Sequence, residues 1–111
     1  MTSLDTATAN ADRAQRQLEE VRADCARVKD FLAFLPRAVE RAEGLGGYYQ
    51  DQWVEDRDEV FAAAGGAVTP EALNEDAIYE ALAEHDALMR RLLLAVARSF
   101  QDTDEDDEAR P

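Results

Sequence analysis

The first 42 residues carry a heptad repeat of apolar side chains, and this repeat constrains the fold more than any other feature. Apolar residues recur there with alternating spacings of three and four, without a slip. Such a repeat is typical of a helix that packs along one seam against another helix. We call the following positions the heptad seam: Leu4, Ala7, Ala11, Ala14, Leu18, Val21, Cys25, Val28, Leu32, Leu35, Val39 and Ala42. They predict a long helix over about residues 5–43.

Pro36 lies inside this predicted helix. A proline in a helix interior removes one backbone hydrogen bond and costs about 3 kcal/mol or more. The heptad seam keeps its phase across Pro36, from Leu35 to Val39, which indicates a kinked helix and not a loop. The glycine-rich residues 44–47 then predict the end of the helix, since glycine readily takes the left-handed cap. They are no phosphate loop, because they follow a helix and not a strand.

A second, shorter helix is expected over about residues 48–64. Tyr49, Trp53 and Phe61 approximate one helical face in this stretch. Two glycines follow it and predict its end.

The last helix is expected over about residues 75–101, because its start carries a cap and a hydrophobic staple. Asparagine is a favourable N-cap residue, carboxylates in the first turn interact well with the helix dipole, and apolar residues around the cap pack together. The residues in these roles are Leu73, Asn74, Glu75, Asp76 and Ile78. An apolar face then continues at helical spacing as far as Val96.

Together these elements predict an all-α fold, an antiparallel helical hairpin of two long helices with the short helix in the connector. The first helix would be about 57 Å long and the last about 39 Å, so several turns of the heptad seam would need another partner. The 111 residues fit one domain, which we place at residues 1–101. Residues 102–111 hold six acids and almost no apolar side chains, so we expect a disordered acidic tail.

The chain is strongly acidic, with 25 Asp and Glu against 12 Lys and Arg and a formal net charge of −13. Eleven of the acids lie in residues 48–89, where Arg57 is the single base. This balance disfavours direct binding to nucleic acids and to anionic membranes, since both attract clustered cations. A basic protein surface is the partner that such a chain more readily attracts.

Nothing in the sequence predicts secretion or insertion into a membrane. No stretch approaches the roughly 20 predominantly apolar residues of a spanning helix, and no basic start followed by an apolar run marks a signal peptide. Cys25 is the single cysteine, so no intrachain disulfide can form, and it occupies the heptad seam as a small apolar residue. We expect a cytoplasmic protein.

The residue types that carry catalysis or bind metals do not form a constellation. His85 is the single histidine and falls on the apolar face of the last helix, so a zinc site or a di-iron bundle would lack ligands. Asp102, Asp104 and Asp106 match the first half of a calcium loop, but Asp107 replaces the glycine that the loop requires. We expect no enzyme activity, no cofactor and no metal.

Tyr48, Tyr49 and Trp53 place three large aromatic side chains within six positions. Trp and Tyr are enriched in binding hot spots, so this group is the candidate interaction site. The second interpretation is that these side chains close one end of the helical core. Because Tyr49 and Phe61 fall near Trp53 on one helical face, the sequence favours the core.

Two short clusters resemble a small bacterial family known as domain of unknown function 4298. The clusters are Tyr48-Tyr49 with Trp53, and the run from Leu73 to Tyr79 with Leu82. Family members pair a long N-terminal helix with a tyrosine–tryptophan segment and a Leu-Ser-Glu-Asp-like start of the last helix. Here Asn74 replaces the serine, and the Ala/Gly-rich connector 62–68 departs from a more charged segment. The resemblance covers about residues 15–96 and implies helical architecture with no known activity.

These features favour a small acidic protein–protein interaction module, an adaptor or regulator that forms a homodimer through the heptad seam. The alternative is an acidic inhibitor of a basic partner, such as an antitoxin, an immunity protein or a nucleic-acid mimic, binding through residues 48–89. A secreted helical hairpin of the Trp-x-Gly type fits less well, because Glu55 stands where glycine should follow Trp53.

Overall fold

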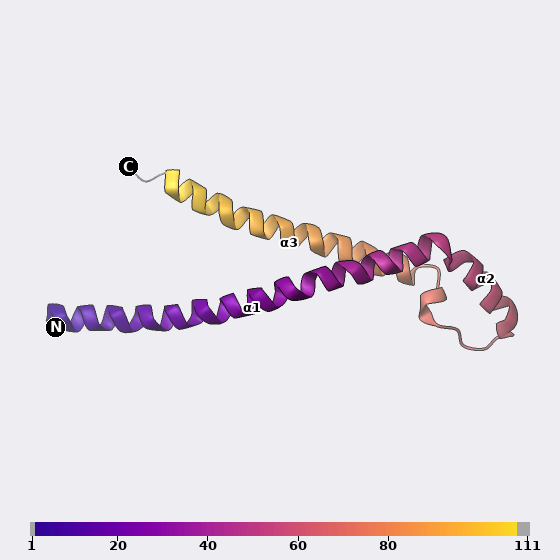
Figure 1. Cartoon of the computed structure of the whole chain (residues 1–111), viewed down its shortest axis with the longest axis horizontal. Coiled ribbons are helices and arrows are strands. Elements are labelled where there is room, and N and C mark those ends of the chain that lie inside the picture. The colour runs from indigo at the N-terminus through magenta and orange to yellow at the C-terminus, as the bar shows by residue number, and fades with distance from the viewer. Residues whose placement is uncertain (1, 109–111) are drawn as a thin grey trace. The chain divides into compact units, whose positions relative to one another are not determined.

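The computed structural model of the protein describes the backbone of residues 2–108 and the side chains of residues 2–101. In chain order the protein forms helix α1 (Ser3–Asp51), helix α2 (Trp53–Ala64), the 3-10 turn η1 (Glu71–Leu73) and helix α3 (Ala77–Glu108) (Figure 1). No strand occurs among the described residues. The predicted all-α class is confirmed.

A reciprocal cap starts α1. The Thr2 hydroxyl accepts a hydrogen bond from the backbone N–H of Asp5 at 3.1 Å, and the Asp5 carboxylate accepts one from the N–H of Thr2 at 3.3 Å. The two bonds satisfy donors that the start of a helix leaves unpaired. From there α1 runs through Pro36 as one continuous helix, as the unbroken phase of the heptad seam predicted (Figure 1).

The glycines of residues 44–47 do not end α1, although the sequence predicted a helix end there. The helix passes through them and ends at Asp51. Among the described residues only Gly65 and Gly66 have a positive φ, so no left-handed cap forms at residues 44–47. Leu45 lies in this run and packs against the buried core, and this contact outweighs the weak helix propensity of glycine.

A single residue, Gln52, separates α1 from α2. Its φ of −130° departs from helical geometry, but its carbonyl still accepts a hydrogen bond from the N–H of Asp56 at 3.1 Å. The short helix expected over residues 48–64 is therefore divided between the last turn of α1 and α2. Gly65 caps α2 in the left-handed conformation with a φ of 54°, at the predicted position.

Helix α3 begins two residues later and ends later than the sequence predicted. The Asp76 carbonyl accepts a helical hydrogen bond from the N–H of Glu80 at 2.9 Å, and the helix starts at Ala77. It continues to Glu108, so the backbone of residues 102–108 is helical where a disordered tail was expected. Residues 109–111 of that tail lie outside the described residues. Neither glycine nor proline occurs within α3 to stop it.

Contacts within the chain divide it into two units, Met1–Glu40 (unit 1) and Arg41–Pro111 (unit 2), where the sequence predicted a single domain over residues 1–101. Unit 2 holds a small core of three buried side chains, those of Trp53, Leu73 and Ile78. The side chains that pack against this core are Leu45, Tyr48, Tyr49 and Leu82. Unit 1 contains no buried residue among those described.

Candidate functional site

Trp53 is the centre of the core of unit 2. Its side chain is 5% exposed, and its indole Nε1–H donates a 2.7 Å hydrogen bond to the backbone carbonyl of Ala72. The bond joins the first residue of α2 to η1, across 19 positions of the chain. A buried indole N–H needs such a partner, because an unpaired one would cost about 1–3 kcal/mol. This geometry agrees with the interpretation of Trp53 as a core residue.

Two side chains at helical spacing contact the Trp53 ring. Tyr49, four positions before it, makes an edge-on contact with ring centroids 5.2 Å apart and planes at 74°. Arg57, four positions after it, holds its guanidinium carbon 4.8 Å from the ring centroid. Both geometries are favourable for an aromatic ring, whose face attracts cations and the edges of other rings. The aromatic group therefore serves the packing of unit 2.

Tyr48 points to a different neighbour. Its hydroxyl donates a 2.9 Å hydrogen bond to the Asp56 carboxylate, which ties the last turn of α1 to α2. The pKa of Tyr48 is raised above its ordinary value of 10.0, first because the hydrogen bond to Asp56 favours the protonated phenol. Desolvation and the charge of Asp56 act in the same direction. Tyr48 and Tyr49 are both half-buried, so neither is a freely exposed anchor.

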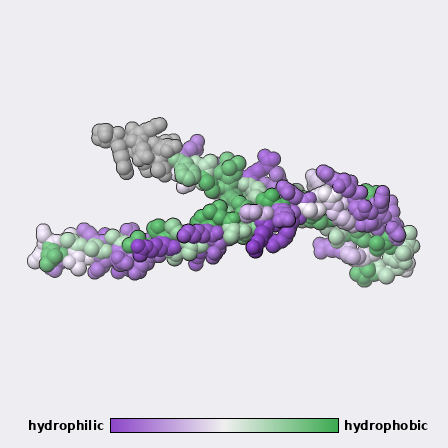
Figure 2. Space-filling view, in the orientation of Figure 1, coloured by the Kyte–Doolittle hydropathy of each residue, from purple (hydrophilic) through white to green (hydrophobic). Residues whose placement is uncertain are grey.

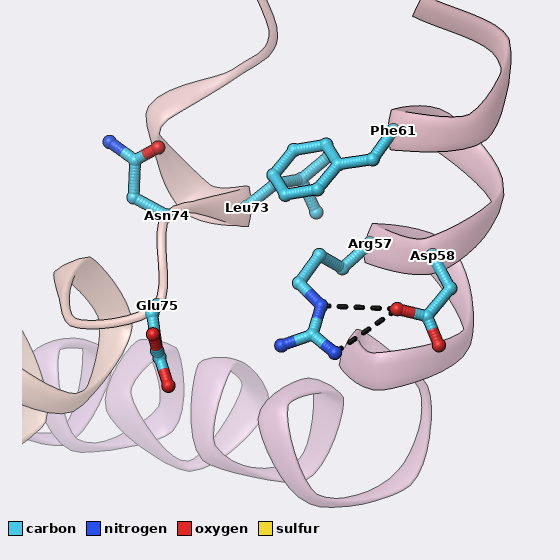
Figure 3. Close-up of a pocket in the computed structure, with 6 residues that line it drawn as sticks. All are labelled: Arg57, Asp58, Phe61, Leu73, Asn74 and Glu75. Carbon is cyan, nitrogen blue, oxygen red and sulfur yellow. Dashed lines mark hydrogen bonds and ion pairs between the residues drawn. The ribbon is translucent and has the colours of Figure 1, made fainter.

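An open pocket of about 420 Å³ lies between α2 and the segment that follows η1 (Figure 3). Its lining residues are Arg57, Asp58, Phe61, Leu73, Asn74 and Glu75. The Phe61 ring lies beside Leu73, and Arg57 extends from α2 toward the opposite wall. Arg57 donates hydrogen bonds to Asp58 at 3.0 and 3.3 Å. Arg57 is therefore engaged on two sides, because it pairs with Asp58 and also stacks on the Trp53 ring.

The predicted cap and staple residues divide into two sets. Leu73 and Ile78, the expected staple, are 5% and 4% exposed and form the core with Trp53. Asn74 is exposed, and its backbone N–H closes η1 on the Glu71 carbonyl at 2.9 Å. Within the described residues the Asn74 side chain has no hydrogen-bond partner.

Glu75 and Asp76 also lie before the first residue of α3. Both side chains are exposed. The sequence therefore located the start of α3 to within two residues through its apolar neighbours, while the polar cap does not adopt the expected hydrogen bond.

The heptad seam in unit 1 contrasts with this core. Val21 and Val28 are each 56% exposed and Leu32 is 59% exposed, although all three are large apolar residues at regular helical spacing. Phe31 and Phe34 are exposed beside them, with ring centroids 6.3 Å apart. Figure 2 shows hydrophobic surface interspersed with hydrophilic surface along α1. Within residues 2–40 no side chain of this face is buried.

The remaining candidates for chemistry stay apart. His85 is half-buried, and Cys25 is exposed in α1. Among the described residues no group of three or more His, Cys, Asp and Glu side chains could hold a metal ion. The ion pair between Asp86 and Arg90, at 2.8 Å, is a surface i,i+4 pair of α3. Over the same part of the chain, none of the helices combines the length and apolar character that crossing a membrane requires.

Sequence reasoning missed Arg57 and Asp56 as structural residues of unit 2. The spacing could have found Arg57, because it is the single base of residues 48–89 and lies four positions after Trp53. The Ala72 carbonyl could not have been found, since a backbone acceptor has no signature in the sequence.

Comparison with known proteins adds no relative. No protein-family model matches the sequence, and neither the curated proteins nor the solved structures gave a significant match. The relationship to domain of unknown function 4298 stays a prediction that depends on the two short clusters described above.

Proposed function

We propose that this protein is a non-enzymatic protein–protein interaction module that self-associates through the heptad seam of unit 1. The observation that carries the proposal is the exposure of large apolar residues at seam positions along residues 4–32. A stretch of four heptads is the length at which such a repeat becomes typical of a coiled coil.

Covering the exposed face of the heptad seam with a second helix is favourable in free energy. Most of the stability of a helix in a protein comes from packing of its apolar face, and an isolated helix is marginal in water. Burying one Val or Leu side chain completely contributes about 1.5–3 kcal/mol. Leu18, Val21, Val28 and Leu32 are all exposed in the single chain, so association would supply the stabilisation that unit 1 lacks.

The surroundings of the seam support an adaptor or regulator in the cytoplasm over an enzyme. The surface is acidic, with a formal net charge of −13, and Cys25 is a free thiol that suits a reducing compartment.

Sedimentation of the full chain at tens of micromolar tests this proposal. The wild-type protein should sediment as a dimer or larger assembly. The double variant Val21→Glu/Val28→Glu should be monomeric, because association would bury unpaired carboxylates. The matched control Ala9→Glu/Ala23→Glu adds the same charge at exposed positions that face away from the seam, and should assemble like the wild type. A monomeric wild type with helical residues 4–32 would overturn the proposal.

A second candidate is an acidic inhibitor that binds a basic partner through residues 48–89. The observation that favours it is the exposure of ten of the eleven acids in this stretch, all but Asp56. Binding of this kind weakens steeply with salt, because the attraction between exposed charges is screened. Capture of a basic partner that survives 0.5 M salt would contradict this candidate and favour an apolar interface.

A further inference from the structure

We propose that the occupant of the heptad seam is a second copy of this chain, aligned parallel and in register. This inference rests on the self-association proposed above and adds the orientation and the register. It follows from the charges that flank the seam in unit 1, taken with the place of Cys25 in the repeat.

The spacing fixes the heptad positions. Residues Leu18, Cys25 and Leu32 occupy position a, and Val21 and Val28 occupy position d. The flanking positions are then Gln15, Arg22 and Lys29 at e, and Gln17, Asp24 and Phe31 at g. The charges are segregated, since both charged e residues are cations and the charged g residue is an anion.

A parallel pair brings opposite charges together. In parallel coiled coils a g residue faces the e residue of the following heptad on the other chain, and such pairs set the orientation of the partners. Asp24 would therefore face Lys29 of the second copy, and Gln17 would face Arg22 of the second copy. Neither Asp24 nor Lys29 takes part in an ion pair within the described residues, so both are available.

An antiparallel pair brings like charges together. In that orientation e faces e and g faces g, so cations at Arg22 and Lys29 would line one flank of the interface on both chains. The Asp24 side chains would face each other or an uncharged residue on the other flank. Like charges across an interface are unfavourable, so the charge pattern selects the parallel orientation.

The position of Cys25 in the repeat allows the register to be tested by disulfide formation. In a parallel, in-register assembly the Cys25 side chains of two copies lie at the same level of the interface. Their Cα atoms are then separated by a distance close to the range of about 4.4–6.8 Å that a disulfide can bridge. In an antiparallel assembly an a residue faces a d residue, so Cys25 would meet an alanine, valine or leucine and not a second Cys25. The Cys25 thiol is exposed in the single chain and free to react.

The order of leucine at a and valine at d shifts coiled coils toward more than two strands. Every parallel assembly of this helix keeps the contact between Asp24 and Lys29 and the shared Cys25 layer. The orientation is therefore tested separately from the number of copies.

Oxidation of the full chain tests the register. Diamide takes two electrons and two protons from a pair of thiols, leaving one disulfide and the reduced hydrazine. We expect rapid formation of a disulfide-linked dimer through Cys25 at concentrations where the protein sediments as an assembly. The control Cys25→Ala/Ala23→Cys places the thiol on the outer face of the same turn and should link only slowly.

Charge reversal tests the orientation. Asp24→Lys and Lys29→Asp should each weaken association about tenfold, because the pair occurs once on each flank and each reversal turns attraction into repulsion. The double variant Asp24→Lys/Lys29→Asp restores the pairing and should restore the wild-type affinity.

The two proposals fail in different ways. An assembly that forms, yet neither links through Cys25 nor weakens on single reversal, would overturn the parallel register and leave self-association standing. A monomeric wild type would overturn both.

Discussion

Units 1 and 2 both contain helices with regularly spaced apolar residues, but the two units differ in how far these residues are buried. Leu32 of unit 1 and Trp53 of unit 2 both lie on helices with periodic apolar residues, yet their side chains are 59% and 5% exposed. The difference is that unit 2 turns back on itself through η1, so that Trp53 meets Ala72 and Leu73. Unit 1 is a single helix with no returning segment. Apolar periodicity thus identifies a face to be covered, while the loops decide what covers it.

Replacing Trp53 should have the largest effect on the stability of the protein. Trp53→Ala should lower the free energy of unfolding by about 3–5 kcal/mol, because it empties the centre of the core and leaves the Ala72 carbonyl without its donor. Denaturant unfolding followed by circular dichroism measures this loss. Leu32→Ala, the matched truncation in unit 1, should cost far less in a protein diluted below the concentration of assembly. Equal costs for the two variants would remove the distinction between the units.

Leu73 and Asn74 give a sharper comparison within unit 2, because the two are neighbours with opposite exposure. Leu73→Ala should cost about 2–4 kcal/mol through the lost burial. Asn74→Ala should change stability by less than about 0.5 kcal/mol, since its side chain makes no capping bond here. Chemical denaturation of both variants is the measurement. A cost near 1 kcal/mol for Asn74→Ala would show that the side chain caps α3 after all.

The smallest effect is expected from pH at Tyr48. The folded state raises the pKa of this phenol, so the stabilisation is fully present below the unfolded pKa near 10.0 and is lost as the pH rises through the higher folded value. Spectrophotometric titration of the wild type against Tyr48→Phe should isolate one tyrosine that ionises above its ordinary pKa. Asp56→Asn should lower that pKa, because it replaces the hydrogen bond to a carboxylate with a weaker one to an amide and removes the charge that opposes the tyrosinate. An unchanged pKa in Asp56→Asn would exclude the Asp56 carboxylate as the cause.

The sequence predicted the helical class, the continuity of α1 through Pro36 and the burial of Leu73 and Ile78. These follow from local spacing, which the chain carries without reference to distant residues. The path through residues 44–47 could not be predicted, because glycine ends a helix only where no tertiary contact holds it. In this protein Leu45 makes that contact.

The sequence identified the aromatic group, but it did not identify the bonds that its members form. Tyr48, Tyr49 and Trp53 do gather with the start of α3, but each finds a different partner. Asn74 was expected as a cap from its residue type, from the acids that follow it and from its place in the staple of Leu73 and Ile78. Its place at the end of η1, which depends on the turn before it, directs its backbone and leaves its side chain in solvent.

The short sequence span of the core has a kinetic consequence. All of its members lie between Leu45 and Leu82, and the bond that closes it spans 19 positions. The entropic cost of loop closure rises only slowly with length, and a ten-residue loop closes in about 10–100 ns. We therefore expect the core of unit 2 to form by a local search, at a rate independent of protein concentration. Any pairing of the seam is a later, bimolecular event, and dilution would slow that event alone.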